Sequence, residues 1–346
     1  MTEISFSQPR HCPIPTHTFE QIRLLFIAKH VFWSGGLHHE DGNHALYHLE
    51  IRDVLKRLGF EVALADTYDV LFDRPDCDFV FPLLNRAGFL NSEMLVPLLC
   101  TRLGLPFLGA TPILRGLADD KHLTKLEARA RGVATAPWAI YRQGAAIDER
   151  LAPMADRMVV KPNASSASWG VRDAGSWAEV HYAVESIHAE GHDAIVEPFL
   201  RGDDIEVPVI HCDGNPAILP MMMFKQADPS QLRTYAEKRD LAEHPPTYSI
   251  EHFDDHDRVD DIIAATRRMA AVFEPFDYGR FEFRFDERTG EINFLEVNLN
   301  CNIWSQKLFA RSASLAGIGH DALIETIVGQ SLIRHGLTGL PREMAA

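Results

Sequence analysis

The chain has 346 residues, of which 46% are hydrophobic and 24% charged, and its formal net charge is −15 at pH 7. This length exceeds what one hydrophobic core usually supports, so we expect two or three domains. The negative charge argues against nucleic acid and anionic membranes as partners, because both attract basic surfaces. No apolar run approaches the ~18 residues of a membrane span, and the N-terminus lacks the pattern of a signal peptide. The five cysteines are scattered and never at metal-ligand spacing, which is typical of reduced thiols in a cytoplasmic protein.

The first third of the chain alternates short apolar strands with helices. After an N-terminal arm (residues 1–20), we expect strands and helices in the following order: strand 23–28, helix 46–58, strand 61–65, strand 78–83, helix 92–103 and strand 106–108. Strands separated by helices indicate a parallel sheet in a doubly wound α/β unit. We assign this N-terminal domain to residues 21–118.

Two further segments follow. The central segment, assigned to residues 119–200, begins with a predicted helix at 120–131 that Gly132 closes as a C-cap, and its strands are expected at 157–161 and 194–197. The C-terminal segment, residues 201–346, starts with a strand at 205–210 and finishes in an amphipathic helix at 320–335.

Residues 279–298 predict a β-hairpin, because charged and aromatic residues alternate in its first half as in a strand with two unlike faces. In the expected pairing, Glu282 lies opposite Glu296. Arg280 then lies opposite Asn298. Two facing carboxylates destabilise a sheet unless something neutralises them, and Mg²⁺ is a hard cation that binds such oxygens. The alternative is an exposed hairpin face that carries solvated charge.

Two strand ends suggest a phosphate site. Lys161 ends a predicted strand and precedes a loop of small hydroxyl residues that includes Ser168. In such a loop, backbone N–H groups can approach phosphate oxygens and the hydroxyls add donors. Residues 197–200 form another strand end followed by a hinge, and a carboxylate of the acidic turn after it, Gly202-Asp203-Asp204, can accept hydrogen bonds from ribose hydroxyls. The alternatives are an inert Ser-rich loop, which is the more common case, and an ordinary acidic turn.

The order of these segments resembles the ATP-grasp superfamily and, within it, the D-alanine–D-alanine ligase family. The segments are Asp120-Lys121 before a helix, VVKP with its Ser-rich loop, VEPFLRGDD, GRFEF and FLEVN. The resemblance spans residues 23–330 and is strongest from 121 to 298. It implies an ATP-grasp fold, in which ATP lies between two antiparallel sheets, behind an N-terminal doubly wound domain.

The resemblance implies a role for each matching residue. The implied ATP-binding residues are Lys121, Lys161, Ser168, Glu197, Pro198, Phe199, Leu200 and Asp204, with Asp204 at the ribose. The implied ligands of Mg²⁺, or of Mn²⁺, are Glu282, Glu296 and Asn298. The implied catalytic groups are Lys238 at the γ-phosphate, Arg280 at the transferred phosphate, and the backbone N–H of Asn302 at the oxyanion.

Several residues depart from the family pattern at the acceptor site. Ala167, Arg239 and Lys307 stand where the family has Ser, Tyr and Ser, and the His-Gly pair expected after strand 78–83 is missing. We therefore expect that D-Ala plus D-Ala is not the substrate pair, and that Arg239 and Lys307 suit an anionic substrate group. The family's Pro-Gly turn is replaced by Asn300-Cys301-Asn302, and Asn tolerates a left-handed backbone well enough to keep the turn.

The loop at residues 33–44 is longer and more aromatic than its counterpart in the family. Glu40 or Asp41 could hold a substrate ammonium, because a buried cation needs a counter-charge. A solvated loop is the alternative. We also expect the polar segment 226–246, which contains Lys238, to act as a lid over the phosphates.

These observations predict an ATP-dependent carboxylate–amine ligase. A donor carboxylate would take the γ-phosphate to give an acylphosphate, which an amine converts to an amide. The expected substrates are an amino acid or a related compound in specialised metabolism, with cyclisation of a single substrate as a variant, and family analogy implies a homodimer. The alternatives are a nucleotide-binding partner or sensor without ligase chemistry, and a kinase that uses the same site. The retained phosphate and metal residues argue against a mere binder.

Overall fold

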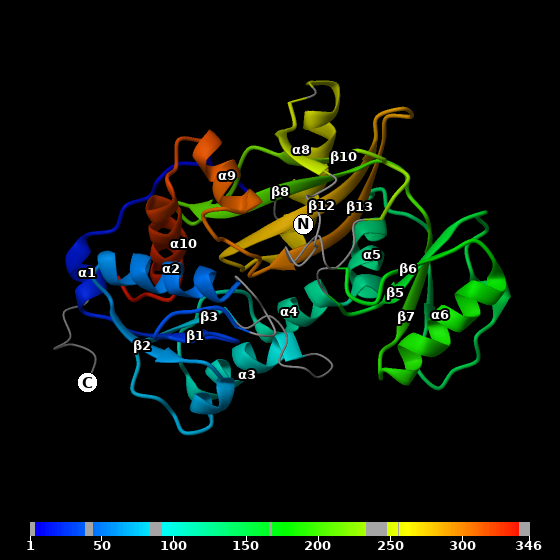
Figure 1. Cartoon of the computed structure of the whole chain (residues 1–346). Coiled ribbons are helices and arrows are strands. Elements are labelled where there is room, and N and C mark those ends of the chain that lie inside the picture. The colour runs from blue at the N-terminus through cyan, green and yellow to red at the C-terminus, as the bar shows by residue number, and fades with distance from the viewer. Residues whose placement is uncertain are drawn as a thin grey trace.

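The computed structural model describes residues 4–38, 44–83, 92–165, 168–232, 248–254 and 256–338. In this part of the chain the strands form three β-sheets, which we call the N-terminal, central and C-terminal sheets. The N-terminal and central sheets lie at opposite ends of the molecule, with the C-terminal sheet between and above them (Figure 1). The architecture is the predicted mixture of one parallel and two antiparallel sheets with helices packed on their faces.

The N-terminal sheet is parallel, with strand order β2-β1-β3. Its strands are β1 (Arg23–Ala28), β2 (Glu61–Ala65) and β3 (Phe79–Leu83), and its main helices are α2 (His44–Arg57) and α3 (Leu95–Leu103). Alternate residues of β1 pack on opposite sides: Phe26 shares a buried cluster with α2, and Ile27 shares one with α3. Helices therefore cover both faces, which confirms the doubly wound arrangement. The prediction of a strand at 106–108 is wrong. Here only Phe107 pairs with the sheet, in an isolated bridge to Val80, and the chain then turns at Gly109, which has φ +123°.

The central sheet is antiparallel, with strand order β4-β7-β5-β6. Its strands are β4 (Ala139–Tyr141), β5 (Met158–Pro162), β6 (Arg172–Ala174) and β7 (Ala194–Pro198), and α6 (Trp177–Ala189) covers one face. The alternation of side chains along β5 separates two environments. Val160 packs in the core under α6, whereas Val159 and Lys161 line a cleft on the other face.

The C-terminal sheet has the order β11-β10-β8-β12-β13, with β9 paired to β8. Its strands are β8 (Asp203–Cys212), β9 (Asn215–Ile218), β10 (Met222–Gln226), β11 (Tyr248–His252), β12 (Tyr278–Asp286) and β13 (Glu291–Leu299). Phe281 and Phe283 of β12 pack in one core with α8 (His256–Phe273). The charged residues between them alternate with this apolar set, so the opposite face of the sheet carries the polar groups.

The remaining helices connect and brace the sheets. They are α1 (Thr16–Glu20), α4 (Pro112–Asp119), α5 (Lys121–Ala130), α9 (Leu308–Leu315) and α10 (His320–Arg334), with 3₁₀ turns at Tyr68–Leu71, Ser92–Met94 and Glu149–Leu151. Asp120 is the N-cap of α5, since its side chain accepts the Leu123 N–H at 2.9 Å. Gly132 follows α5 at φ +65°, the left-handed conformation expected of a helix-ending glycine.

The N-terminal arm, residues 4–15, crosses the C-terminal sheet and then runs along α10. The backbone N–H of Ser7 donates to the Pro216 carbonyl at 2.9 Å, beside β9. Farther along, the Cys12 N–H donates to Thr326 Oγ1 at 3.1 Å, and Nε2 of His11 lies 2.7 Å from Glu325. The arm therefore links the edge strand β9 of the C-terminal sheet to α10.

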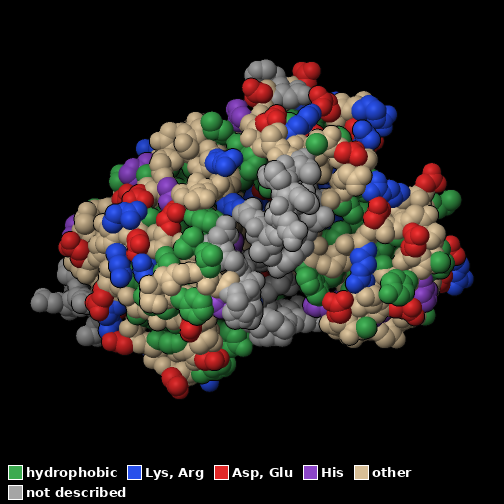
Figure 2. Space-filling model, in the orientation of Figure 1, with side chains coloured by type: hydrophobic (Ala, Val, Ile, Leu, Met, Phe, Trp, Pro, Cys, Tyr) green, Lys and Arg blue, Asp and Glu red, His purple; other side chains and the backbone are tan. Residues whose placement is uncertain are grey.

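The surface carries both signs of charge. Lys and Arg side chains are interspersed with Asp and Glu over the face seen in Figure 2, without a large patch of one sign. None of the described helices is both long enough and apolar enough to cross a membrane.

Candidate active site

A cleft separates the central sheet from the C-terminal sheet and gathers the predicted nucleotide-binding residues. Its lining consists of Lys121, Val159, Lys161, Ser165, Ser168, Val171, Glu197, Pro198, Phe199, Leu200, Asp204, Leu232, Glu282, Arg284, Leu295 and Glu296. All eight residues predicted to bind ATP are in this set, and so are two of the three predicted metal ligands. Residues up to 175 positions apart in sequence thus form one concave surface with cationic, acidic and apolar parts.

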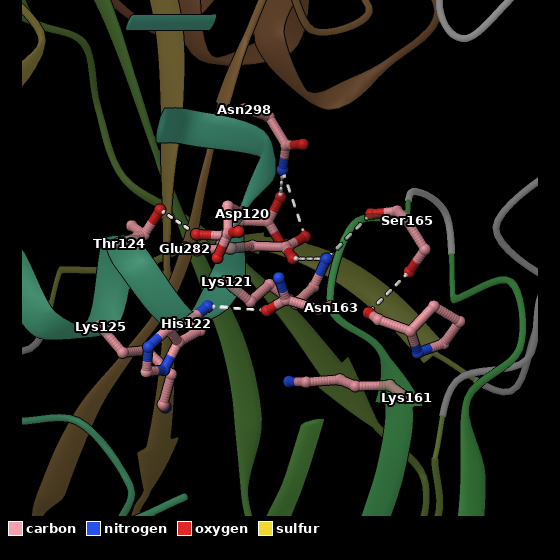
Figure 3. Close-up of polar contacts among 12 residues, drawn as sticks. Asp120, Lys121, His122, Thr124, Lys125, Lys161, Asn163, Ser165, Glu282 and Asn298 are labelled. Atoms are coloured by element: carbon pink, nitrogen blue, oxygen red, sulfur yellow. Dashed lines mark hydrogen bonds and ion pairs between the residues drawn. The ribbon is translucent and has the colours of Figure 1, made fainter. Parts of the chain in front are cut away.

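The hairpin of β12 and β13 has the predicted register, with Glu282 opposite Glu296 and Arg280 opposite Asn298. A bulge shifts the register by one residue beyond Glu282. The Nδ2 atom of Asn298 lies 2.6 Å from Oε1 of Glu282 and 3.3 Å from Oε1 of Glu296, so the three side chains converge (Figure 3). On the other side, Lys121 Nζ lies 3.2 Å from Oε2 of Glu296.

This cluster fits a hard divalent cation. Two carboxylates and one carboxamide supply oxygen ligands, and rotation of the Asn298 amide by 180° exchanges its nitrogen for its oxygen. Among the residues that the structure describes, no group of three or more His, Cys, Asp or Glu side chains is placed to hold a metal. A Mg²⁺ ion at the hairpin would therefore complete its coordination with phosphate oxygens and water, as is usual for this ion.

Arg280 lies between two carboxylates. Its Nε is 2.9 Å from Oε2 of Glu206 on β8, and its Nη2 is 2.6 Å from Oε1 of Glu282. Burial alone would lower the pKa of Arg280, but the two carboxylates raise it above its ordinary value, so the guanidinium is charged. Glu206 is a site residue that the sequence analysis missed. Its signal is the period of two from Asp204, which places both side chains on the same face of β8.

Glu197 is held by two lysines. Lys125 Nζ lies 2.6 Å from Oε1 of Glu197, and Lys161 contacts Oε2. Burial alone would raise the pKa of Glu197, but the charges of Lys125 and Lys161 hold it at about 2. The carboxylate is thus engaged by cations within the cleft wall. Lys125 was also missed, although it stands one helical turn after Lys121 and so lies on the same face of α5.

The Ser-rich loop is anchored to the beginning of α5. Lys121 Nζ donates to the Ser165 carbonyl at 2.9 Å, and the His122 N–H donates to Asn163 Oδ1 at 2.9 Å (Figure 3). Farther along the same loop, Ser168 has φ +61°, a left-handed conformation. Lys121 is only 6% exposed, so its ammonium is directed into the cleft and not into bulk water.

The turn after β13 is tied to α2 of the N-terminal sheet. Asn300 takes the left-handed conformation predicted for it, with φ +60°. The side chain of Asn302 accepts the Trp304 N–H at 2.8 Å through Oδ1, which directs its Nδ2 to His44 Nε2, also at 2.8 Å. Lys307 lies beside Trp304, with Nζ 5.9 Å from the ring centroid.

Glu50 of α2 strengthens the same junction. Its carboxylate accepts the Trp304 Nε1–H and the Ser305 hydroxyl, each at 3.0 Å. His320, at the start of α10, lies 3.2 Å from the other carboxylate oxygen. The turn that contains Asn302 is therefore fixed by α2 and α10 at once. Four predicted residues, Glu40, Asp41, Lys238 and Arg239, lie outside the described residues, as do Ala167 and most of the predicted lid.

Two antiparallel sheets that enclose a cleft with convergent lysines, carboxylates and a metal-binding hairpin define the ATP-grasp class. The family model "D-ala D-ala ligase C-terminus" matches residues 128–329, more than half of the chain. The chain therefore belongs to the D-alanine–D-alanine ligase family and is an ATP-grasp ligase.

Relatives and solved structures agree with this family. The chain is 30% identical over 240 residues to the uncharacterized protein y4sG of Sinorhizobium fredii, covering 67% of this chain and 68% of that protein. It is 25% identical over 285 residues to a D-alanine–D-alanine ligase of Actinobacillus pleuropneumoniae, covering 80% of this chain and 89% of that protein. The fold matches a D-alanine–D-alanine ligase of Bacillus anthracis complexed with ATP, with a TM-score of 0.72, 19% identity and coverage of 91% and 99%. It also matches a D-Ala:D-Ser ligase of Enterococcus faecalis, with a TM-score of 0.68, 14% identity and coverage of 89% and 99%.

Proposed function

We propose that this ligase joins a carboxylate to an amine in an ATP-dependent reaction that passes through an acylphosphate. The observation that carries the proposal is the convergence of Asn298, Glu282 and Glu296 beside Lys121 and Arg280. This arrangement offers metal ligands and fixed cations beside a cleft that also has apolar walls. It suits a triphosphate next to a base, and a relative of the same fold is complexed with ATP.

In the first step, an oxygen of the donor carboxylate attacks the γ-phosphorus of ATP. The bond from this phosphorus to the β–γ bridging oxygen breaks, and ADP leaves. Lys121 and Lys161 hold the phosphate chain, while Glu282, Glu296 and Asn298 would hold Mg²⁺, which offsets phosphate charge when bound. Arg280 is fixed by its two carboxylates, and we assign its remaining N–H groups to the transferred phosphoryl group. We assign Lys238 to the γ-phosphate.

In the second step, the amine nitrogen attacks the acyl carbon. The bond from carbon to the phosphate oxygen breaks, inorganic phosphate leaves, and the amine loses a proton to give a neutral amide. Negative charge develops on the acyl oxygen before that bond breaks. We assign its stabilisation to Arg280 and to the backbone N–H of Asn302, whose turn is held rigidly by His44 and Glu50.

We propose an amino acid or a related compound as substrate, used in specialised metabolism, with ring closure within one molecule as a variant. Lys307, beside Trp304, and Arg239 suit a substrate with an additional anionic group, and Glu40 or Asp41 suits its ammonium. We also propose that two D-alanines are not joined efficiently, because an acceptor that loses several hydrogen bonds at the departed positions reacts orders of magnitude more slowly. We further propose a cytoplasmic homodimer, by analogy with the family.

A substrate screen tests the proposed reaction. The purified protein with ATP and Mg²⁺ is offered a panel of amino acids, singly and in pairs, with phosphate release as readout and mass spectrometry of the products. We expect an amide, ADP and phosphate from at least one combination, and only background release with D-Ala alone. Robust D-Ala-D-Ala formation would contradict the substrate assignment. A phosphorylated product that accumulates in the presence of amines would instead indicate a kinase.

A further inference from the structure

Arg284 lies in the cleft and is not among the nucleotide-binding residues expected from the sequence. It stands two residues after Glu282 on β12, and the strand register places it directly opposite Asp204 on β8. Its Nη1 donates to the Gly202 carbonyl at 2.8 Å, and its Nη2 lies 3.1 Å from Oδ1 of Asp204. The side chain is 12% exposed and lines the cleft.

The third nitrogen of this guanidinium is different. Nε of Arg284 is buried and has no hydrogen-bond partner among the described residues. A buried charged donor without an acceptor costs folding free energy, so such a group normally meets a ligand or an ordered water. Because Gly202 and Asp204 fix both Nη atoms, the planar fork of Arg284 holds the Nε–H in one direction.

The position of Arg284 along the strand identifies which part of a nucleotide it meets. Residues two apart on a strand are about 6–7 Å apart, so Arg284 is one such step from the metal carboxylate Glu282. The cleft is also lined by the apolar side chains Phe199 and Leu200, which follow strand β7. A nucleotide with its phosphates at Glu282 and its base against Phe199 and Leu200 would have its sugar beside Arg284 and the opposing Asp204.

We propose that Arg284 is a nucleotide-binding residue whose Nε–H donates to a ribose hydroxyl oxygen of the bound nucleoside phosphate. Its Nη2 at the same time holds the Asp204 carboxylate in place beside that sugar. Arg284 thereby selects ribonucleotides over deoxyribonucleotides. This inference rests on the proposed function, because it places ATP in the cleft.

Calorimetric titration with ADP, 2′-deoxy-ADP and 3′-deoxy-ADP in the presence of Mg²⁺ tests the inference without a carboxylate or amine substrate. We expect the wild-type protein to bind at least one deoxy analogue about tenfold more weakly than ADP, the effect of one hydrogen bond from a charged donor. We expect Arg284→Met to weaken ADP binding by a similar factor. In this variant the affinity for ADP should exceed that for either deoxy analogue by less than twofold. The matched control is Arg288→Met, since Arg288 lies on the same hairpin but is 73% exposed, and it binds all three ligands as the wild type does.

Arg284→Lys separates ligand binding from folding. Lysine retains the positive charge that Asp204 needs but has no nitrogen at the Nε position, so we expect a folded protein that has lost the preference. A folded Arg284→Lys protein with the full wild-type preference would overturn the inference. Equal affinities of the wild-type protein for ADP and both deoxy analogues would also overturn it and leave the ligase proposal standing. Absence of ADP binding to the wild-type protein would overturn both.

Discussion

Glu206 and Arg280 form an ion pair beside the metal-binding carboxylate Glu282, with Oε2 of Glu206 2.9 Å from Nε of the guanidinium. Glu206 is 4% exposed and lies in register with Glu282 on the neighbouring strand. Arg280 therefore has one partner on each side and little freedom to rotate. A cation that must meet charge developing in a transition state is most effective when it is held in place beforehand.

Glu206→Gln should lower turnover more than nucleotide affinity. Glutamine fills the same volume but supplies no charge, so Arg280 keeps only Glu282 as a charged partner and points less precisely at the transferred phosphate. We expect kcat to fall at least about tenfold, with ADP affinity within twofold of wild type, since removing one charged hydrogen bond costs about 1.5–3 kcal/mol. Steady-state phosphate release and calorimetry provide the two values. An unchanged kcat would show that Glu206 has no role in positioning Arg280.

Glu296→Gln should abolish turnover while the protein still folds. The change removes one of two metal carboxylates and also the partner of Lys121 at 3.2 Å. Metal-assisted charge stabilisation is worth several kcal/mol in such transfers, so we expect ADP formation to fall by at least about a hundredfold even at saturating Mg²⁺. Glu291→Gln, an exposed carboxylate on the same strand, is the matched control and should retain activity. ADP formation near the wild-type rate in Glu296→Gln would refute the metal assignment.

The Glu197 cluster should make the protein sensitive to acid. The pKa of Glu197 is about 2 in the folded protein, against an ordinary value of 4.5. The unfolded chain therefore binds this proton first, so stability from the carboxylate is complete above pH 4.5 and is lost as the pH falls toward 2. We expect Glu197→Gln to be less stable than wild type at pH 7, on the order of 3 kcal/mol, because it leaves buried lysine charge unpaired.

Urea unfolding from pH 7 down to pH 2.5 measures this difference. The gap between Glu197→Gln and wild type should narrow steadily below pH 4.5, because the unfolded wild-type chain then binds a proton at this carboxyl that the folded protein does not bind until about pH 2. Glu185→Gln changes a carboxylate that is 60% exposed and serves as the control, with no pH-dependent gap expected. A constant difference across the whole range would mean that the two lysines do not depress the Glu197 pKa.

The contact between His44 and Asn302 should support the second chemical step. Because Asn302 donates to His44 Nε2, the imidazole is unprotonated at that nitrogen. His44→Leu removes the acceptor and loosens the turn that carries the proposed oxyanion donor. We expect ligation to slow at least about tenfold with ADP affinity preserved, the cost of a displaced oxyanion donor.

His44→Gln tests whether the hydrogen bond itself is needed. The glutamine carbonyl can accept from the Asn302 amide, so this variant should recover most of the rate that His44→Leu loses. Both rates come from amide formation measured by mass spectrometry. Equal losses in the two variants would assign His44 a role in packing alone.

Local patterns in the sequence predicted the parts of the site that depend on a single strand or hairpin. The alternation of residues along the strands and the position of the hairpin loop correctly predicted that Glu282 pairs with Glu296. The tendency of asparagine to adopt a left-handed backbone correctly predicted the conformation of Asn300. Glu206 and Arg284 each stand two residues from a predicted ligand, but the sequence did not identify them as site residues. Their positions in the site depend on the pairing of β8 with β12, which no local pattern encodes. The contact between His44 and Asn302 joins residues 258 positions apart, and no local pattern encodes such a distance.

The N-terminal arm has a consequence for how the chain folds. His11 meets Glu325 across 314 positions of sequence, so the arm leaves the ribosome long before its partner helix α10 has been made. Contacts of such separation form late and slowly, because the whole intervening chain must already be compact. Until then, the apolar arm side chains stay in solvent, and a chain stopped before His320 never covers them. Such a truncated chain should be captured by chaperones or aggregate, although it retains every residue that lines the cleft.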